Sequence, residues 1–249
     1  MTMKKRMASA TASRVARLWM GVEPRVRQAR CLEQAAQIMV EALAQEFSES
    51  AVLTRAFCTV PFDALPPANR RFTQRMAEAA GAADELRTVT PVLSLVGSFG
   101  VEPEWCDRRK SRGHVGTPLI SEAFVHEIPM IARLLSDLGI PLGDIGTNEG
   151  PTIKNTMARA AGLFHVEAAA EAIDSHGRRV IPALEFVSQY GVQSVFGIGG
   201  PYVGGQIFVL IAFCRDAVPR AAAEQFLALV AQFKAKTARL VGEGRIFDG

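Results

Sequence analysis

One polar segment holds most of the side chains that could recognise a small charged molecule. Between Glu102 and His114 the chain reads Glu-Pro-Glu-Trp-Cys-Asp-Arg-Arg-Lys-Ser-Arg-Gly-His. An arginine binds carboxylate or phosphate through paired hydrogen bonds, a tryptophan ring stacks on another ring, and a neutral histidine donates and accepts. We therefore predict that this loop binds an anionic or ring-containing ligand. The predicted binding residues are Trp105, Arg108, Arg109, Arg112 and His114.

The same loop has a purely structural interpretation. Its arginines lie close in sequence to three carboxylates, so ion pairs within the loop would leave no charge for a ligand. These carboxylates belong to Glu102, Glu104 and Asp107. Both interpretations remain open at the level of the sequence.

Cys106 is the second chemical candidate in this loop. Neighbouring cations lower the pKa of a thiol, and Arg108 and Arg109 follow Cys106 closely, so Cys106 is a candidate redox residue. His114 is also considered as a haem or metal ligand, but His126 and His165 are not spaced as partners in a metal motif. We predict no metal site, and the sequence identifies no cofactor.

A glycine-rich stretch, 197–205, resembles a phosphate-binding loop only superficially. It lacks the Lys-Ser/Thr pair of a P-loop, and an apolar strand rather than a helix follows it. The sequence instead predicts a β-hairpin, with strands over 194–199 and 205–214. No Gly-x-Ser-x-Gly motif for a serine nucleophile is present.

The elements that must position this loop follow from hydrophobic periodicity. Helical spacing predicts helices and apolar β-branched runs predict strands. Pro129 falls inside a predicted helix, where either a kink or a later helix start is expected. Before the hairpin, the predicted helices are 14–20, 26–47, 69–80, 121–138 and 153–161, and the predicted strands are 51–60, 89–99, 163–166 and 180–190. A final helix begins at Pro219. This order favours an α+β fold with the first and last helices on one face of an antiparallel sheet.

Two segments resemble a known family. The run from Glu185 to Gly200, followed by Gln206–Phe213 and a helix that begins at Pro219, resembles the C-terminal half of a GAF domain. The loop described above, with Ile128-Pro-Met-Ile131 after it, resembles a GAF-like subgroup of bacterial sensory proteins.

The resemblance implies a PAS-related fold. Its sheet has five or six antiparallel strands, with the terminal helices on one face and a loop- and helix-covered pocket on the other. It also implies a non-catalytic, small-molecule-sensing domain that relays binding through its terminal helices. The expected partners are a small ligand, a second copy of the chain and a separate signalling output protein. The alternatives are a GAF-fold thiol-dependent reductase that uses Cys106 and a ligand-free dimerisation module.

The resemblance sets the expected domain boundaries. Residues 1–23 are expected to form a flexible or short-helical extension, residues 24–241 a single GAF-like domain, and residues 242–249 a tail. This arrangement leaves one domain in the chain of 249 residues.

Composition excludes several classes of protein. Hydrophobic residues make up 49% and charged residues 21% of the chain, which is typical of a globular protein and not of a disordered one. The longest apolar run, Ile207–Cys214, is far shorter than the roughly 20 residues of a membrane span. The basic start is not followed by the apolar run of a secretory signal, so a cytoplasmic location is expected. The net charge of +3 comes largely from basic residues before position 31, and we expect no nucleic-acid or membrane partner.

Overall fold

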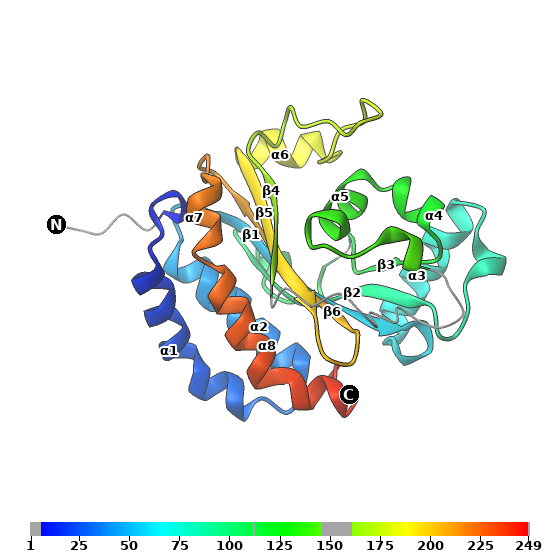
Figure 1. The fold of residues 1–249 in the computed structure, drawn as a ribbon, viewed down its shortest axis with the longest axis horizontal. Coiled ribbons are helices and arrows are strands. Elements are labelled where there is room, and N and C mark those ends of the chain that lie inside the picture. Colours follow the sequence, from blue (N-terminus) through cyan, green and yellow to red (C-terminus); the bar gives the residue numbers. More distant parts are fainter. Residues whose placement is uncertain (1–5, 112, 146–160, 249) are drawn as a thin grey trace.

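A six-stranded antiparallel sheet forms the centre of the protein (Figure 1). The computed structural model describes residues 6–111, 113–145 and 161–248. The strand order is β3-β2-β1-β6-β5-β4. The strands are β1 (Ala51–Pro61), β2 (Pro91–Gly100), β3 (Gly116–Pro118), β4 (Gly162–Val166), β5 (Ser194–Pro201) and β6 (Ile207–Cys214). The predicted α+β class, the six-stranded antiparallel sheet and the 194–214 hairpin are confirmed.

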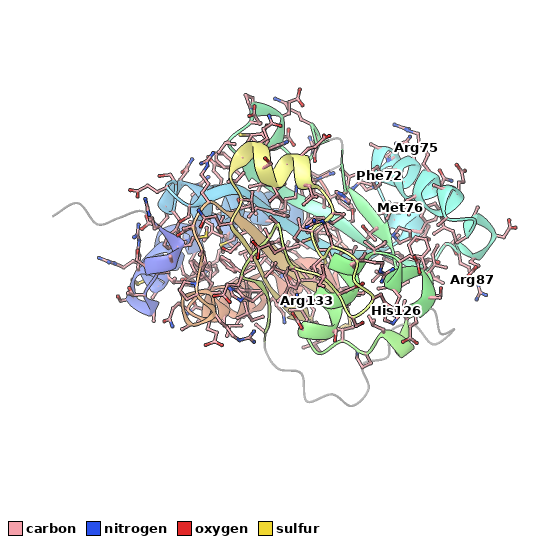
Figure 2. The ribbon with its side chains drawn as sticks, turned by 90° about the horizontal axis from the view of Figure 1, so that it is seen from above. Phe72, Arg75, Met76, Arg87, His126 and Arg133 are labelled. Carbon is pink, nitrogen blue, oxygen red and sulfur yellow. The ribbon has the colours of Figure 1, made fainter. Side chains whose placement is uncertain are left out.

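Helices cover both faces of the sheet (Figure 1). The back face carries α1 (Ala12–Gln28), α2 (Leu32–Glu46), α7 (Arg220–Glu224) and α8 (Leu227–Gly242). The front face and the β3 edge carry α3 (Pro67–Ala79), α4 (Glu122–His126), α5 (Pro129–Asp137) and α6 (Leu184–Tyr190). Seen from above, α3 with Phe72, Arg75 and Met76 lies at the end of the molecule opposite α1 (Figure 2).

Alternation along β1 separates two hydrophobic cores. Ala56 and Cys58 belong to the back core, whereas Leu53 and Phe57 belong to the front core. This period of two is the geometry of a strand that is buried on both faces. Arg55 occupies a front position in the same strand, between Leu53 and Phe57.

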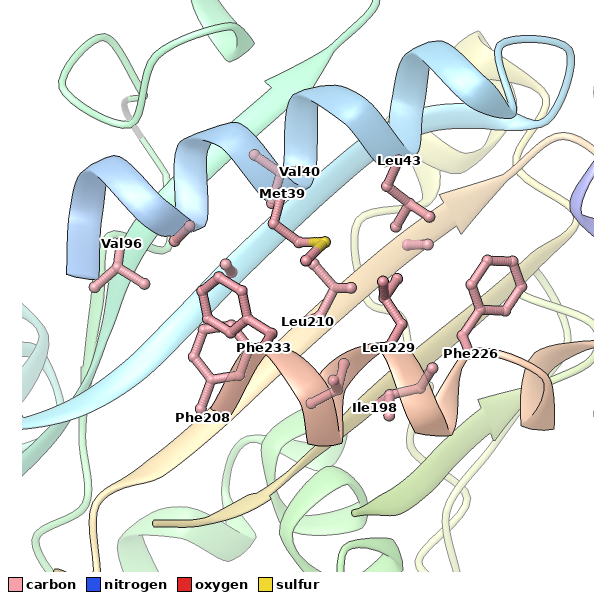
Figure 3. Close-up of a cluster of buried hydrophobic side chains, with 14 of the residues drawn as sticks. Met39, Val40, Leu43, Val96, Ile198, Phe208, Leu210, Phe226, Leu229 and Phe233 are labelled. Atoms are coloured by element: carbon pink, nitrogen blue, oxygen red, sulfur yellow. The ribbon is translucent and has the colours of Figure 1, made fainter. Parts of the chain in front are cut away.

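Aromatic side chains fill the back core between the sheet and the helices (Figure 3). Phe208 of β6 stacks on Phe233 of α8 with ring centroids 4.8 Å apart, and Met39 and Leu43 of α2 pack into the same cluster. Buried apolar area of this kind is the main favourable contribution to folding. The back core is therefore closely packed with large apolar side chains of the described residues.

Helix α2 lies against β2 at backbone contact distance. A Cβ atom on Gly97 would lie 2.9 Å from the carbonyl carbon of Ala36, closer than Cβ atoms normally approach another atom. The Gln37 side chain accepts a hydrogen bond from the Ser98 amide (3.1 Å) and donates to the carbonyls of Ser98 (3.0 Å) and Cys106 (3.1 Å). One side chain thus joins α2, β2 and the polar loop.

The N-terminal boundary predicted at residue 24 falls inside a helix. Helix α1 is 17 residues long, and it runs through Pro24 from the predicted helix 14–20 into the first residues of the predicted helix 26–47. Met7 is fully buried and donates its backbone N–H to Ser50 Oγ at 2.7 Å, while Trp19 packs in the back core. Residues 7–23 are thus part of the packed domain, because their apolar side chains help to cover α2 and α8.

The predicted tail, 242–249, is also packed against the domain. The backbone N–H groups of Leu32 and Glu33, at the start of α2, donate to the carbonyls of Arg245 (2.9 Å) and Ile246 (2.8 Å). These bonds satisfy amides that a helix N-terminus otherwise leaves without partners. The described part of the tail therefore caps α2.

Three other predicted elements differ from those observed. The predicted strand over 180–190 contains helix α6, whose C-terminus is closed by Gly191 in the left-handed conformation. The predicted helix over 121–138 is divided into α4 and α5 at Pro129, as its ring requires. Strand β3 was not predicted, and the predicted helix over 153–161 lies almost entirely outside the described residues. None of the described helices is long and apolar enough to cross a membrane.

Candidate functional site

A cavity of about 330 Å³ lies on the front of the sheet, under the polar loop. Its volume is near the lower end of the range for small-molecule sites, and its wall is mostly apolar with a few polar groups, as such sites usually are. The apolar wall includes Leu53, Phe57, Leu93, Ile131, Phe186 and Phe213. The polar groups are those of Arg55, Glu104, Lys110, Ser111, His114 and Thr117.

Trp105 forms part of an aromatic wall. It ends a short 3-10 helix, Pro103–Trp105, and its ring lies 5.6 Å from Phe186 and 4.8 Å from Tyr190 between centroids. Phe186 in turn makes an edge contact with Phe213 at 5.4 Å. This wall joins the loop, α6 and β6, and it offers ring faces and edges to an apolar or aromatic ligand.

Arg55 places a cation in this apolar surface. It lies in the centre of β1 between Ser98 on β2 and Ile211 on β6, and only 9% of its surface is exposed. Its Nη1 donates to the Gly113 carbonyl (3.1 Å) and its Nη2 to Ser111 Oγ (2.8 Å), whereas its Nε has no hydrogen-bond partner among the described residues. Burial lowers the pKa of Arg55 to about 10, so the group stays charged at neutral pH.

His114 lies beside Arg55 at the edge of the cavity. Its φ of 52° places it in the left-handed region, which is rarely occupied by residues other than glycine and often marks functional sites. Desolvation by the surrounding protein atoms, and secondly the charge of Arg55, hold the pKa of His114 below its usual value, although the residue is partly open to water. A neutral His114 can both donate and accept a hydrogen bond.

This pair predicts a measurable pH effect. Arg55→Met is expected to raise the pKa of His114, but only partly, because burial remains. In the wild type, His114 is protonated in the unfolded chain below about pH 6.5, but in the folded chain only at a lower pH. The free energy of unfolding therefore falls as the pH drops from about 6.5 to the lower pKa of the folded state. NMR titration of the imidazole carbon-bound protons measures the midpoint, with exposed His176 as the internal control. An unchanged midpoint in the variant would contradict the proximity of the two charges.

Arg108 and Arg109 do not line the cavity, contrary to the predicted site. Arg108 Nη2 lies 2.5 Å from Glu33 Oε2 and the Arg108 guanidinium lies 4.8 Å from the centre of the Phe247 ring. Arg109 Nε donates to Glu33 Oε1 at 3.0 Å. Both arginines are neutralised by Glu33, so they hold the loop to α2 and the C-terminal residues. The structural interpretation had expected their partners within the loop, at Glu102, Glu104 and Asp107.

The remaining predicted residues have separate environments. Arg112 lies outside the described residues. Cys106 is half-buried outside the cavity wall, and its Sγ lies 3.4 Å from the carbonyl oxygens of Gly100 and Glu102. Cys58 and Cys214 belong to the core on the opposite face, where burial raises the pKa of Cys58 to about 12. They are therefore poorly placed to resolve an oxidised Cys106.

The other histidines do not join His114. His165 Nε2 lies 2.8 Å from the Val218 carbonyl, and His126 lies on α4 beside Glu122, 3.5 Å away (Figure 2 labels His126). In the described parts of the chain, no three His, Cys, Asp or Glu side chains come together as a metal site would require. The arrangement instead offers two cations, Arg55 and Lys110, and several hydrogen-bonding groups around an apolar cavity.

Comparison with known proteins gives a likeness of fold. No protein-family model matches the sequence, and no curated protein matches it either. Among solved structures, the chain is similar to the GAF domain of an Acinetobacter phosphoenolpyruvate-protein phosphotransferase, with 15% identity, coverage of 93% of this chain and 98% of that chain, and a TM-score of 0.47. It is similar to the GAF domain of the corresponding Coxiella burnetii protein, with 12% identity, coverage of 94% and 99%, and a TM-score of 0.49. A phycoerythrobilin-bound GAF domain from a cyanobacterial phytochrome is 12% identical, with coverage of 92% and 97% and a TM-score of 0.47.

The strand order and the two helical layers define the class of protein. The chain is an α+β domain in which an antiparallel sheet separates a packed helical face from a face with a cavity. This is the architecture that the resemblance in the sequence implied.

Sequence reasoning missed Arg55, the most deeply buried cation of the cavity wall. The feature that could have indicated this residue is a single charged side chain within a mostly apolar run, Ala51–Val60. Arginine is rarely buried without a partner, so its position in a strand that is buried on both faces was itself informative. The loop attracted attention because it carries several arginines, yet two of them face α2.

Proposed function

We propose that this GAF-like chain is a non-catalytic sensory domain that binds a small molecule in the front cavity. The observation that supports it is the cavity itself: an apolar space of about 330 Å³ with a few polar groups, as lined by the described residues. A ligand-free dimerisation module would be expected to fill this space with its own side chains. The thiol-reductase alternative has less support, because Cys58 and Cys214 are fully buried in the back core, whereas Cys106 is half-buried in the polar loop.

The polar loop supplies a route from the cavity to the helices on the back. Trp105 and His114 line the cavity, while Arg108, between them, binds Glu33 at the start of α2. A ligand that favours one loop position over another would shift this contact, and only such a difference in affinity can shift a conformational equilibrium. We propose that α1, α2 and α8 receive the signal.

The expected partners and location remain part of the proposal. The resemblance to bacterial sensory proteins supports a homodimer through the terminal helices and a separate signalling output protein. All four cysteines are free, which suits a reducing compartment such as the bacterial cytoplasm.

The cavity predicts saturable binding of an apolar probe. The neutral dye N-phenyl-1-naphthylamine should bind with enhanced fluorescence, and a large side chain in the cavity wall should abolish this binding by occupying the space. We would test Ala183→Trp on the α6 side and Ile131→Trp on the α5 side. Ala221→Trp, an exposed position on α7 at the back, is the matched control.

Loss of dye binding in both cavity variants, with binding retained in the Ala221 control, would support the proposal. If none of the variants changes dye binding, the dye binds outside the cavity and the proposal is contradicted. The proposal is also contradicted if the wild-type protein binds no dye. Thermal unfolding of each variant shows whether a loss of binding comes from misfolding.

A further inference from the structure

We infer that the ligand of the front cavity carries an anionic group and that Arg55 is the residue that binds it. This inference rests on the proposed function, because it specifies the ligand of the same cavity. It assigns the anion to a strand residue, not to the arginines of the loop.

The charge balance at Arg55 carries the inference. Its guanidinium is nine-tenths buried and lines the cavity, yet it forms no ion pair with any described carboxylate. By contrast, the buried Arg108 is neutralised by Glu33 at 2.5 Å. A buried charge without a counterion is energetically costly, and proteins seldom keep one unless a partner compensates it. A bound anion would supply the missing charge.

Unused hydrogen-bond donors point the same way. The two contacts of Arg55, to Ser111 and Gly113, use neutral acceptors and leave further N–H groups free, including Nε. The Oγ of Ser98, its neighbour across the strands, is likewise buried and has no partner in the part of the chain that the structure describes. A carboxylate, sulfonate or phosphate accepts several such bonds at once, and charge-assisted bonds of this kind are the stronger ones.

A purely structural role would not require the charge. If Arg55 served only to hold the loop, any neutral donor could bind the Gly113 carbonyl and Ser111 Oγ without the cost of burying a cation. The role of Arg55 as a tether and its role as an anion receptor are compatible, because the same guanidinium contacts the loop. An anion at Arg55 would then act directly on the segment that leads to Arg108.

The surroundings define the rest of the ligand. Lys110 and His114 add a second cation and a neutral hydrogen-bonding group near the cavity edge, while Glu104, the acidic group in the described wall, is exposed to water. The remaining wall is apolar and aromatic. The expected ligand is therefore an amphiphile with one anionic group and an apolar or ring-containing body.

A matched pair of dyes tests this. The probe 1-anilinonaphthalene-8-sulfonate has the ring system of N-phenyl-1-naphthylamine with a sulfonate added. We expect the wild type to bind the sulfonate more tightly, and Arg55→Met to weaken sulfonate binding by roughly 10- to 100-fold while changing neutral-dye binding by no more than about twofold. Arg55→Lys, which keeps the charge, should lose less. Arg17→Met, an exposed change of the same charge on α1, should leave both affinities unchanged.

The outcomes separate the two proposals. If Arg55→Met alters both dyes equally, or neither, Arg55 is not an anion receptor, although the cavity still binds small molecules. If neither dye binds the wild type, or if Ala183→Trp leaves both affinities intact, the proposed function fails and the inference fails with it. Circular dichroism and thermal unfolding show whether Arg55→Met keeps the fold. If Arg55→Met does not fold, the dye affinities of Arg55→Lys provide the test.

Discussion

Replacing Glu33 with alanine is expected to lower the free energy of unfolding by about 3 kcal/mol or more, because it leaves a buried cation without its counterion. The Arg108 side chain is 6% exposed and the Glu33 side chain 9%, so water replaces little of the lost interaction. Glu33 Oε2 also accepts the Asp248 backbone N–H at 2.9 Å, and that bond is lost as well. Thermal unfolding should show a fall in Tm of roughly 10 °C.

Two controls identify the cause of this loss. Arg109→Ala removes the other arginine of Glu33, but Arg109 is 53% exposed, and an exposed ion pair contributes no more than about 1 kcal/mol. The double variant Glu33→Met, Arg108→Met removes both buried charges and should recover much of the stability. If Glu33→Ala unfolds at the wild-type temperature, Glu33 does not compensate Arg108 in solution.

Gly97→Ala is expected to lower the free energy of unfolding by about 3 kcal/mol, because the added methyl group has no room between β2 and α2. The new Cβ would meet backbone atoms of Ala36 and Gln37 at 2.9–3.1 Å, and these cannot rotate away as a side-chain tip can. Helix α2 would have to move off β2, which would also strain the hydrogen bonds of the Gln37 side chain to Ser98. Chemical denaturation of the purified variant measures the loss.

Gly21→Ala is the matched control for that variant. Gly21 lies within α1, is exposed, and has no atom within 4 Å of an added Cβ. Alanine there should raise the free energy of unfolding by about 0.5–1 kcal/mol, because glycine inside a helix carries a larger entropy cost. Equal effects of the two substitutions would show that α2 does not lie at contact distance from β2.

Local patterns predicted the elements whose neighbours in space are also neighbours in sequence. The hairpin of β5 and β6 followed from two apolar runs around a glycine-rich turn, and β1 and β2 followed from their composition. Helix α6 was predicted as a strand because its apolar residues fit either period over so short a length. Only packing against the front core decides between them.

The candidate site was predicted in part, and the reason lies in long-range pairing. The sequence indicated the loop, and two of its predicted residues, Trp105 and His114, do line the cavity. It could not show that Arg108 pairs with Glu33, 75 residues earlier in the chain. Which side of a loop faces a cavity depends on such partners, and a single sequence does not contain them.

The junction at Glu33 makes three distant segments open and close as one unit. The Glu33 carboxylate binds Arg108 and Arg109 of the loop and accepts the backbone N–H of Asp248. The backbone N–H of Glu33 donates to the Ile246 carbonyl. No one of these segments can leave without exposing buried charge on the others, so their fluctuations belong to a single local unfolding event. The rate at which ligand binding under the loop changes the conformation at the end of α8 would then depend on the barrier to that event as well as on the affinity of the cavity.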